Sequence, residues 1–312
     1  MYSKNIVIAI LLLVLIVFSF TPIAIAEEKS AADTSIASET AKAAAATTEE
    51  KPTGDFTVAA MSKYVWRGYE LSRNSIVVQP SATIGYKGFT ANIWGNLDTN
   101  PYFSGTGDKS YSSTWNETDL TLSYTKNLGL FNLGAGYIYY SLGSLNKDAP
   151  DRADMQEIFA TTSLNSLLSP TLTAYKEIDH YRNWYFLLGV SHIFEFNKMV
   201  SMKLAASASY LLSTYADATL FNAGAGYGGY PEFDSNCQAT NDKFSNFHDG
   251  NVTISLPIKA TGYITITPII SYVFPLSKDA KNEMKGSGMK GSSPDDRDSS
   301  FIYGGLAASF SF

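Results

Sequence analysis

The sequence has few of the residues on which soluble enzymes and metal proteins rely. Its 312 residues include one cysteine and three histidines, and only 17% of them are charged. The single cysteine, Cys237, excludes an intramolecular disulfide and any Cys-x-x-Cys motif, and leaves a free or modified thiol. No serine lies in a GxSxG motif and no histidines have HExxH spacing. The sequence therefore predicts no enzyme, no cofactor and no metal site.

The charge and the aromatic content of the chain indicate contact with lipid and not with nucleic acid. The formal net charge is −6 at pH 7, and a mildly acidic chain does not indicate a nucleic-acid partner. Tyrosine and phenylalanine are abundant, with 20 and 18 residues. Low charge together with many aromatic side chains suits a surface that meets lipid and its interfaces better than one that meets only water.

One long hydrophobic run is present, at the start of the chain. Lys4 precedes an apolar stretch from Ile6 to Phe20, and the small residues Ala24 and Ala26 follow it. This order predicts a secretory signal peptide over residues 1–26, cleaved after Ala26, and the alternative is an uncleaved membrane anchor. No later segment approaches the run of about 20 apolar residues that a membrane-spanning helix needs.

The composition changes twice after the apolar run. Residues 27–53 are rich in Ala, Thr, Ser and Glu and contain Ile36 as their one large hydrophobic residue. Such a segment cannot bury a core, so we predict a flexible periplasmic leader, with a short Ala-rich helix as the alternative. Over residues 54–312, polar and apolar residues alternate instead, with no sustained helical period.

This alternation predicts β-strands with one apolar and one polar face. In the first strand Phe56 and Val58 alternate with Thr57, and Tyr64 follows Lys63. Twelve candidate strands show the pattern, at 56–66, 76–86, 89–97, 117–124, 131–139, 158–164, 171–179, 184–194, 200–210, 252–258, 264–274 and 302–312.

The links between these segments distinguish a membrane barrel from a soluble sandwich. Short turns, such as 87–88 and 197–198, alternate with long links, such as 99–114 and 212–250, and the link at 180–183 is the exception. Short turns at one rim, long loops at the other and both chain ends at the short-turn rim are typical of outer-membrane barrels. We therefore predict an all-β, antiparallel up-and-down transmembrane barrel of about twelve strands over residues 54–312, with periplasmic termini. Ten or fourteen strands remain open, because 212–250 has room for a further hairpin.

Several motifs resemble those of a known family. They are Ser62 to Gly68 (SKYVWRG), the segment from Gln79 to Asn96, Ser169 to Tyr175 with Gly189 to His192, and Val252 to Pro257. Together they are similar to the TorF-type family of proteobacterial porins, and the resemblance covers nearly all of residues 54–312. It implies an outer-membrane barrel without implying a substrate. The end of the chain, with Phe310 and Phe312, resembles the C-terminal strand that the barrel-assembly machinery recognises.

The same alternation selects residues for the lumen. If the even-numbered residues of the first strand face lipid, charged residues on the opposite parity face inward, where water or a partner must stabilise them. The lumen-lining candidates are Lys63, Arg67, Asp98, Glu117, Asp119, Glu157, Glu177, Asp179, Lys203 and Lys259. They predict either a charge-lined aqueous path or a lumen closed by internal ion pairs.

The predicted function is an outer-membrane porin-like channel for passive diffusion of small polar solutes or ions, in a Gram-negative bacterium. The alternative is a non-conducting structural or adhesive barrel that binds a partner through its long external loops, and 212–250 could serve as a constriction or as an outer surface. The expected partners are outer-membrane lipid, lipopolysaccharide, the barrel-assembly machinery and small solutes. A hydrolase built on His180, His192 or His248, and a cation site formed by Glu157, Glu177 and Asp179 with loop 293–298, are the less favoured hypotheses.

Overall fold

The computed structural model describes residues 51–101, 113–143, 154–215, 229–288, 290 and 293–312. The predicted signal peptide (1–26) lies outside the described residues, as does the predicted leader (27–53) up to residue 50. Within the described residues, no helix is long and apolar enough to cross a membrane.

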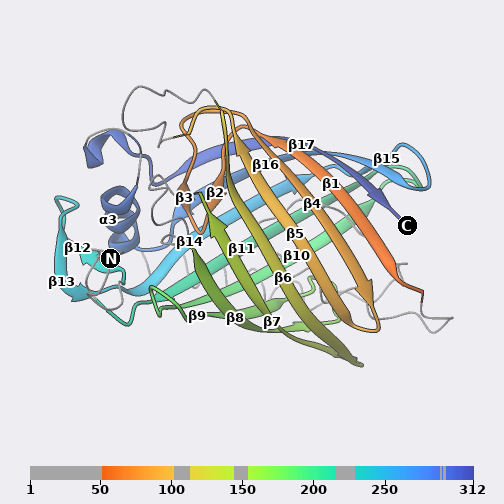
Figure 1. The fold of residues 1–312 in the computed structure, drawn as a ribbon, viewed down its shortest axis with the longest axis horizontal. Coiled ribbons are helices and arrows are strands. Elements are labelled where there is room, and N and C mark those ends of the chain that lie inside the picture. Colours follow the sequence, from red (N-terminus) through yellow and green to blue (C-terminus); the bar gives the residue numbers. More distant parts are fainter. Residues whose placement is uncertain (1–50, 102–112, 144–153, 216–228, 289, 291–292) are drawn as a thin grey trace.

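The described residues form a closed antiparallel barrel of twelve strands (Figure 1). The barrel strands are β1 (Thr53–Met61), β4 (Val77–Tyr86), β5 (Phe89–Asp98), β6 (Thr114–Leu128), β7 (Phe131–Leu142), β8 (Met155–Leu164), β9 (Thr171–Glu177), β10 (Trp184–Glu195), β11 (Ser201–Leu212), β14 (Ser245–Ser255), β16 (Ile264–Pro275) and β17 (Phe301–Ser311). Each pairs with the next along the chain, and β17 pairs with β1 to close the sheet. The predicted all-β, antiparallel up-and-down barrel of twelve strands is confirmed. Closure leaves the barrel without an edge strand.

The remaining elements are short, and they lie at the barrel ends except for β2 and β3, which lie inside the barrel. They are β2 (Val65–Trp66) and β3 (Tyr69–Glu70), β12 (Pro231–Phe233) and β13 (Ala239–Lys243), β15 (Ile258–Lys259), the helix α3 (Lys278–Ser287) and the 3-10 turn η2 (Pro294–Asp296). The pair β12–β13 is the further hairpin for which 212–250 had room, but it forms a separate sheet and adds no strand to the barrel.

The outer face of the barrel is apolar and the inner face is polar. Outward side chains at mid-strand are each between 44% and 58% exposed, and include Ile84, Ile93, Leu122, Ile158, Leu188, Val252, Ile270 and Leu306. Inward polar side chains are each at most 9% exposed, and include Thr57, Asn92, Thr121, Ser123, Thr161, Thr173, Ser209, Thr253, Ser271 and Ser309. So large an apolar surface on every strand requires an apolar surrounding, as in a lipid-embedded barrel.

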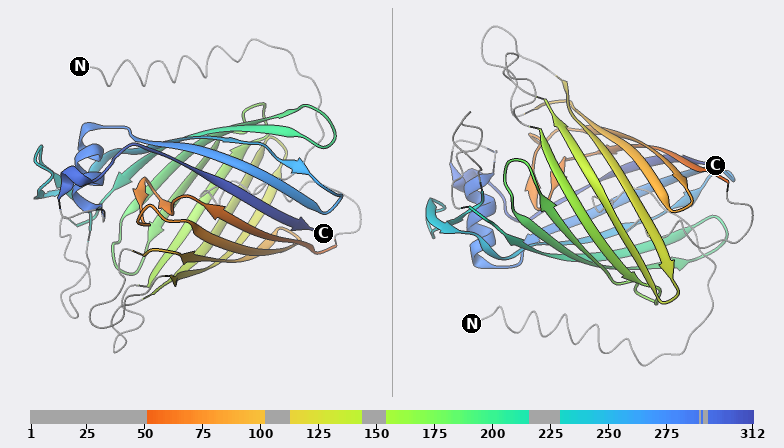
Figure 2. Two further views of the ribbon diagram at one scale, coloured as in Figure 1. Left: turned by 90° about the horizontal axis from the view of Figure 1, so that it is seen from above. Right: turned by 60° about the horizontal axis from the view of Figure 1, so that its bottom comes forward.

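The two rims differ in the length of their connections. At the short-turn end, β4 and β5 are joined by Lys87 and Gly88, both with positive φ. Gly54 and Phe312 exchange backbone hydrogen bonds of 2.9 and 3.0 Å, which places the C-terminus beside the start of β1 at this same end. Figure 2 shows α3 at the opposite, long-loop end from the C-terminus.

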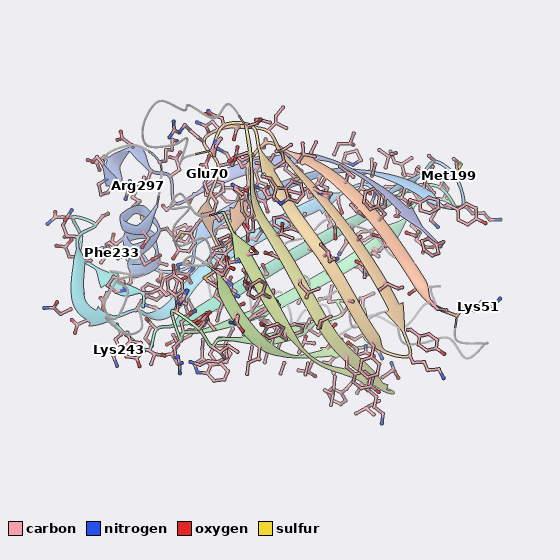
Figure 3. The ribbon with its side chains drawn as sticks, viewed as in Figure 1. Lys51, Glu70, Met199, Phe233, Lys243 and Arg297 are labelled. Carbon is pink, nitrogen blue, oxygen red and sulfur yellow. The ribbon has the colours of Figure 1, made fainter. Side chains whose placement is uncertain are left out.

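Side chains at the two ends can be followed in Figure 3. Lys51 and Met199 lie at the short-turn end, and Phe233, Lys243 and Arg297 lie at the other. Phe312 is 72% exposed and Phe310 is 44% exposed, so both predicted assembly residues lie on the outer surface near the short-turn end.

Candidate functional site: the lumen and the hairpin that closes it

A hairpin inside the barrel follows β1. The predicted first strand extended to Trp66, but β1 ends at Met61 and the chain turns into the lumen. We call residues 65–70, which comprise β2, β3 and their turn, the inner hairpin. Arg67 and Gly68 form its two-residue turn with φ of 45° and 86°, as a type I′ turn requires. β2 and β3 form a two-stranded sheet of their own, separate from the barrel sheet.

Arg67 anchors the tip of the inner hairpin to the far wall. Its Nη1 and Nη2 donate to Glu157 Oε1 and Oε2 on β8 at 2.8 and 2.6 Å. The Tyr140 hydroxyl of β7 donates to Glu157 Oε2 at 2.8 Å. Burial opposes the charge on Arg67, but the Glu157 carboxylate outweighs it and raises the pKa of Arg67 overall. The guanidinium therefore stays charged, and the pair is a two-bond contact of the strong kind.

Aromatic rings surround the Arg67 guanidinium on its other sides. The ring centres of Trp66, Tyr175 and Tyr185 lie 4.6, 5.0 and 4.3 Å from Cζ. At these distances each ring attracts the cation. The turn also packs closely, because a Cβ at Gly68 would lie 2.8 Å from Asp249 Cβ and 3.0 Å from Met284 Cε. Both its conformation and its surroundings therefore favour glycine at position 68.

A second network ties the inner hairpin to α3. The Tyr69 hydroxyl donates to Glu283 Oε2 at 2.7 Å. Burial, followed by the nearby Glu283 carboxylate, raises the pKa of Tyr69 well above its usual value, so the hydroxyl keeps its proton. His248 Nε2 lies 3.0 Å from Glu283 Oε2, and its Nδ1 lies 3.0 Å from Asp249 Oδ1. Glu283 and His248 are fully buried.

The helix α3 covers the long-loop end. Ser277 caps it by accepting a hydrogen bond from the Ala280 backbone N–H at 3.0 Å, and Ala280, Glu283 and Met284 form its buried face. The described part of loop 275–300 is thus folded, and its helix covers the long-loop end of the barrel. The pair β12–β13 lies beyond α3, and Phe233 packs against Gly286 of the helix (Figure 1).

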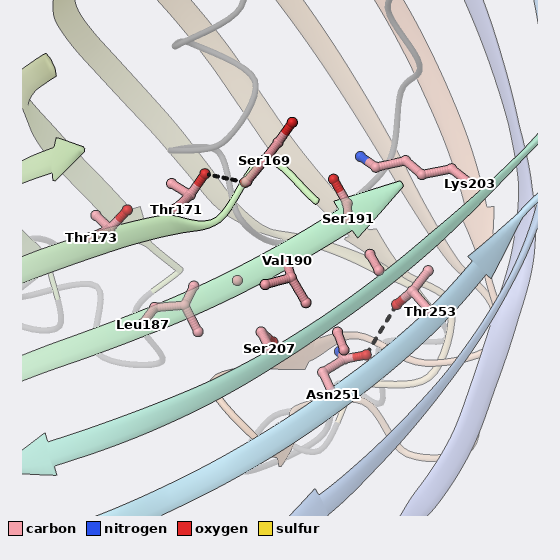
Figure 4. Close-up of a pocket in the computed structure, with 13 residues that line it drawn as sticks. Ser169, Thr171, Thr173, Leu187, Val190, Ser191, Lys203, Ser207, Asn251 and Thr253 are labelled. Atoms are coloured by element: carbon pink, nitrogen blue, oxygen red, sulfur yellow. Dashed lines mark hydrogen bonds between the residues drawn. The ribbon is translucent and has the colours of Figure 1, made fainter. Parts of the chain in front are cut away.

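Below the inner hairpin the lumen is hollow. A cavity with about 2190 Å³ of space free of protein atoms, including space open to solvent, extends from Thr53 and Asp55 at the short-turn end to Arg67. Small polar side chains share its wall with apolar and aromatic ones, and its upper part is formed by the inner hairpin with Tyr140, Tyr175 and Tyr185. A smaller recess of about 530 Å³, also including open space, lies along β9, β10, β11 and β14 (Figure 4).

Four of the predicted lumen residues line these spaces. Lys63, Arg67 and Asp119 line the large cavity, and Lys203 lines the smaller recess. Lys63 Nζ donates to Glu70 Oε1 at 2.5 Å and to Asn74 Oδ1 at 2.8 Å, so it braces the segment around the inner hairpin.

The other predicted residues are mostly structural. Asp98 Oδ1 accepts from Ser75 Oγ at 2.6 Å, and Glu177 accepts from the backbone N–H groups of residues 179–182 at 2.6 to 2.9 Å. Asp179 Oδ2 accepts from Gln156 at 3.2 Å, and Lys259 lies on β15 at the short-turn end. Glu117 and Glu157 are 6% and 2% exposed.

The alternation of residues missed Glu283, His248 and Asp249 as parts of the closure. They meet because the barrel brings β14 beside the loop that carries α3, and nothing in the mostly polar stretch 245–251 distinguishes His248 and Asp249 from their neighbours. Within the described residues, no group of three or more His, Cys, Asp or Glu side chains could hold a metal ion, so the cation site that combined Glu157, Glu177 and Asp179 does not form there.

Comparisons with known proteins find matches among solved structures only, and these have low sequence identity to this chain. No protein family and no curated protein matches the sequence. Among solved structures, the NanC porin has 11% identity and a TM-score of 0.46, with 82% of this chain and 98% of the porin covered. An outer-membrane channel from Pseudomonas putida F1 has 10% identity and a TM-score of 0.42, with 86% and 97% covered. Likeness at this level assigns no function, and the resemblance to the TorF-type family stays a prediction.

The chain's own geometry defines its class. It is an antiparallel β-barrel with an apolar exterior, a polar interior and a folded closure at one end. This is the architecture of transmembrane barrels.

Proposed function

We propose that the protein is an outer-membrane channel of a Gram-negative bacterium for passive diffusion of small polar solutes or ions. The single observation that carries the proposal is the open cavity inside the barrel, which runs from the short-turn end to the inner hairpin. Small hydroxyl and amide side chains line a water-filled path at little cost, whereas a purely structural lumen is normally filled by side chains.

The inner hairpin narrows this channel at the long-loop end. It is held by the Arg67–Glu157 pair, by the rings around Arg67 and by the Tyr69–Glu283 contact, and all of these must break together for it to move. We therefore expect a low resting conductance that rises when the inner hairpin leaves its site.

The membrane location and the partners belong to the same proposal. Lipid and lipopolysaccharide would meet the apolar outer face, with the short turns and termini in the periplasm, and the assembly machinery would recognise β17 with Phe310 and Phe312. We also propose that the chain is not an enzyme: both ring nitrogens of His248 face carboxylates, and Ser209 Oγ donates to Asp249 Oδ1 at 2.6 Å rather than to His248.

The closed long-loop end favours a second candidate, a non-conducting barrel that binds a partner at its outer surface. One experiment separates the two. Purified protein is reconstituted in liposomes and in planar bilayers, and swelling in small sugars is measured beside ionic current. The channel proposal expects both signals, whereas an intact, heat-modifiable barrel that passes neither solute nor current would leave the second candidate.

A further inference from the structure

The inner face of β6 carries a row of oxygen atoms without hydrogen-bond partners. Asp119 Oδ1, Thr121 Oγ1, Ser123 Oγ and Thr125 Oγ1 are all buried, and none has a partner within the described residues. They occupy four consecutive inward positions of one strand. Buried polar groups are normally paired, so a continuous unpaired row calls for an explanation.

Inward hydroxyl groups elsewhere on the wall are paired. Thr57 bonds to Ser309 at 2.9 Å, Thr161 bonds to Thr173 at 3.0 Å, and Thr253 bonds to Ser271 at 2.7 Å. Outside β6, the one other buried hydroxyl that lacks a partner in the described part of the chain is that of Thr267. The unpaired row is therefore a property of β6.

Two carboxyl groups stand at the upper end of this row. Glu117 and Asp119 are 6% and 4% exposed, and neither takes part in an ion pair within the described residues. Two basic residues, Lys63 and Arg67, were also predicted to line the lumen. Lys63 forms an ion pair with Glu70, and Arg67 forms one with Glu157. A side-chain hydrogen bond joins Glu117 to Asp119, so one of the two carboxyl groups carries a proton. The pair then holds one negative charge, without a basic partner.

Aromatic rings flank the acidic pair. Trp94 on β5 and Tyr140 on β7 lie directly across from Asp119 in the strand registers. Tyr64 packs on Trp94 with ring centres 5.6 Å apart. Carboxylates and aromatic faces attract cations, and hydroxyl oxygens can coordinate them.

We propose that the inner face of β6 is a path for small monovalent cations, with Glu117 and Asp119 as its binding site. Asp119, Thr121 and Ser123 all line the large cavity, so the row leads from the short-turn side to the acidic pair. This inference rests on the proposed channel and names its substrate class. The carboxyl oxygens and the hydroxyl oxygens replace part of the water around a cation, and the negative charge of the carboxyl pair repels an anion.

The test is the reversal potential of the purified full-length protein in a planar bilayer under a KCl gradient. Wild-type protein should pass K⁺ about tenfold more readily than Cl⁻, the scale expected of a carboxylate close to the ion. Asp119→Asn combined with Glu117→Gln should bring this ratio near one. The control Asp242→Asn changes an exposed acid on β13 and should leave the ratio unchanged. An unchanged ratio in the double variant overturns the proposal.

The hydroxyl row has its own matched pair of variants. Thr121→Val removes an unpaired hydroxyl and should lower K⁺ current, whereas Thr57→Val removes a paired one from the same cavity and should not. Equal K⁺ currents in the two variants would show that the unpaired hydroxyl groups of β6 do not contribute to cation passage.

Cation binding can also be measured without current. Trp94 faces Asp119, so tryptophan fluorescence and the melting temperature in KCl are compared with those in N-methylglucamine chloride at equal ionic strength. A K⁺-dependent change that disappears in the double variant supports the site even if no channel opens. A wild-type barrel without current refutes the proposed function, and one without any K⁺-dependent change refutes this inference.

Discussion

The two ends of the barrel are built from the same strands, but they are filled differently. At the long-loop end, Arg67, Glu157, Glu283 and His248 form a dense network of charged and aromatic side chains around the inner hairpin. At the short-turn end, hydroxyl and amide side chains leave the large cavity open. Strand number sets the width of the lumen, whereas the residues that fold into it decide how much of it remains open.

Buried polar groups are also stabilised in different ways at the two ends of the barrel. In the long-loop half, Arg67 pairs with Glu157 and His248 contacts Glu283 and Asp249, and removing one partner leaves the other buried and uncompensated. In the short-turn half, small polar groups face space that water can occupy. Variants in the first region should therefore have the larger effects.

The largest effect is expected from Arg67→Ala. It leaves the Glu157 carboxylate buried without its cation and removes three ring contacts, so the inner hairpin should lose about 3–5 kcal/mol of local stability. Hydrogen exchange of the amides in residues 64–71 measures this loss. Arg67→Lys, which keeps the charge but not the two-bond geometry, should lie between the variant and the wild type. Equal protection in all three proteins would show that the pair does not hold the hairpin.

Adjacent residues of β14 test the two faces of the wall. Val252 is 44% exposed on the apolar outer face, and Asn251 lines the cavity. Val252→Arg should lower the free energy of unfolding in lipid by about 2–4 kcal/mol, and Asn251→Arg by clearly less. Urea titration of the reconstituted barrel provides the comparison, and the reverse order would mean that the faces have been exchanged.

A smaller effect is expected at α3. Glu283→Ala removes the acceptor shared by Tyr69, His248 and Ser287, and should cost about 1–3 kcal/mol of helix docking. Lys281→Ala on the exposed side of the same helix should change stability by about 0.5 kcal/mol or less. Limited proteolysis of loop 275–300 reports docking, and similar cleavage of both variants would count against the Glu283 network.

The smallest effect is expected beyond α3. Replacing residues 234–241 of the β12–β13 hairpin by two glycines should leave single-channel conductance unchanged, because this hairpin lies outside the lumen and Phe233, which packs on α3, is retained. A rise in conductance would restore the alternative in which segment 212–250 constricts the channel.

The sequence predicts the barrel wall well and the closure poorly, for a physical reason. Side-chain alternation and connection length are local properties, and they suffice for the twelve strands and for the separation of the two rims. The inner hairpin keeps the alternation of β1, and its Arg67-Gly68 turn lacks the Asn-Gly or Asp-Gly pair that marks most such turns. Its anchor, Glu157, is 90 residues away in the chain, so only the closed barrel brings the two together.

The central claim is that the inner hairpin closes a lumen that is otherwise open. The most direct test is the single-channel conductance of the wild type beside a variant in which residues 64–71 are replaced by a short glycine-serine link. The account predicts a several-fold higher conductance in the variant, with the folded barrel confirmed by heat modifiability. Equal conductance in the two proteins would contradict it, because the constriction would then lie elsewhere.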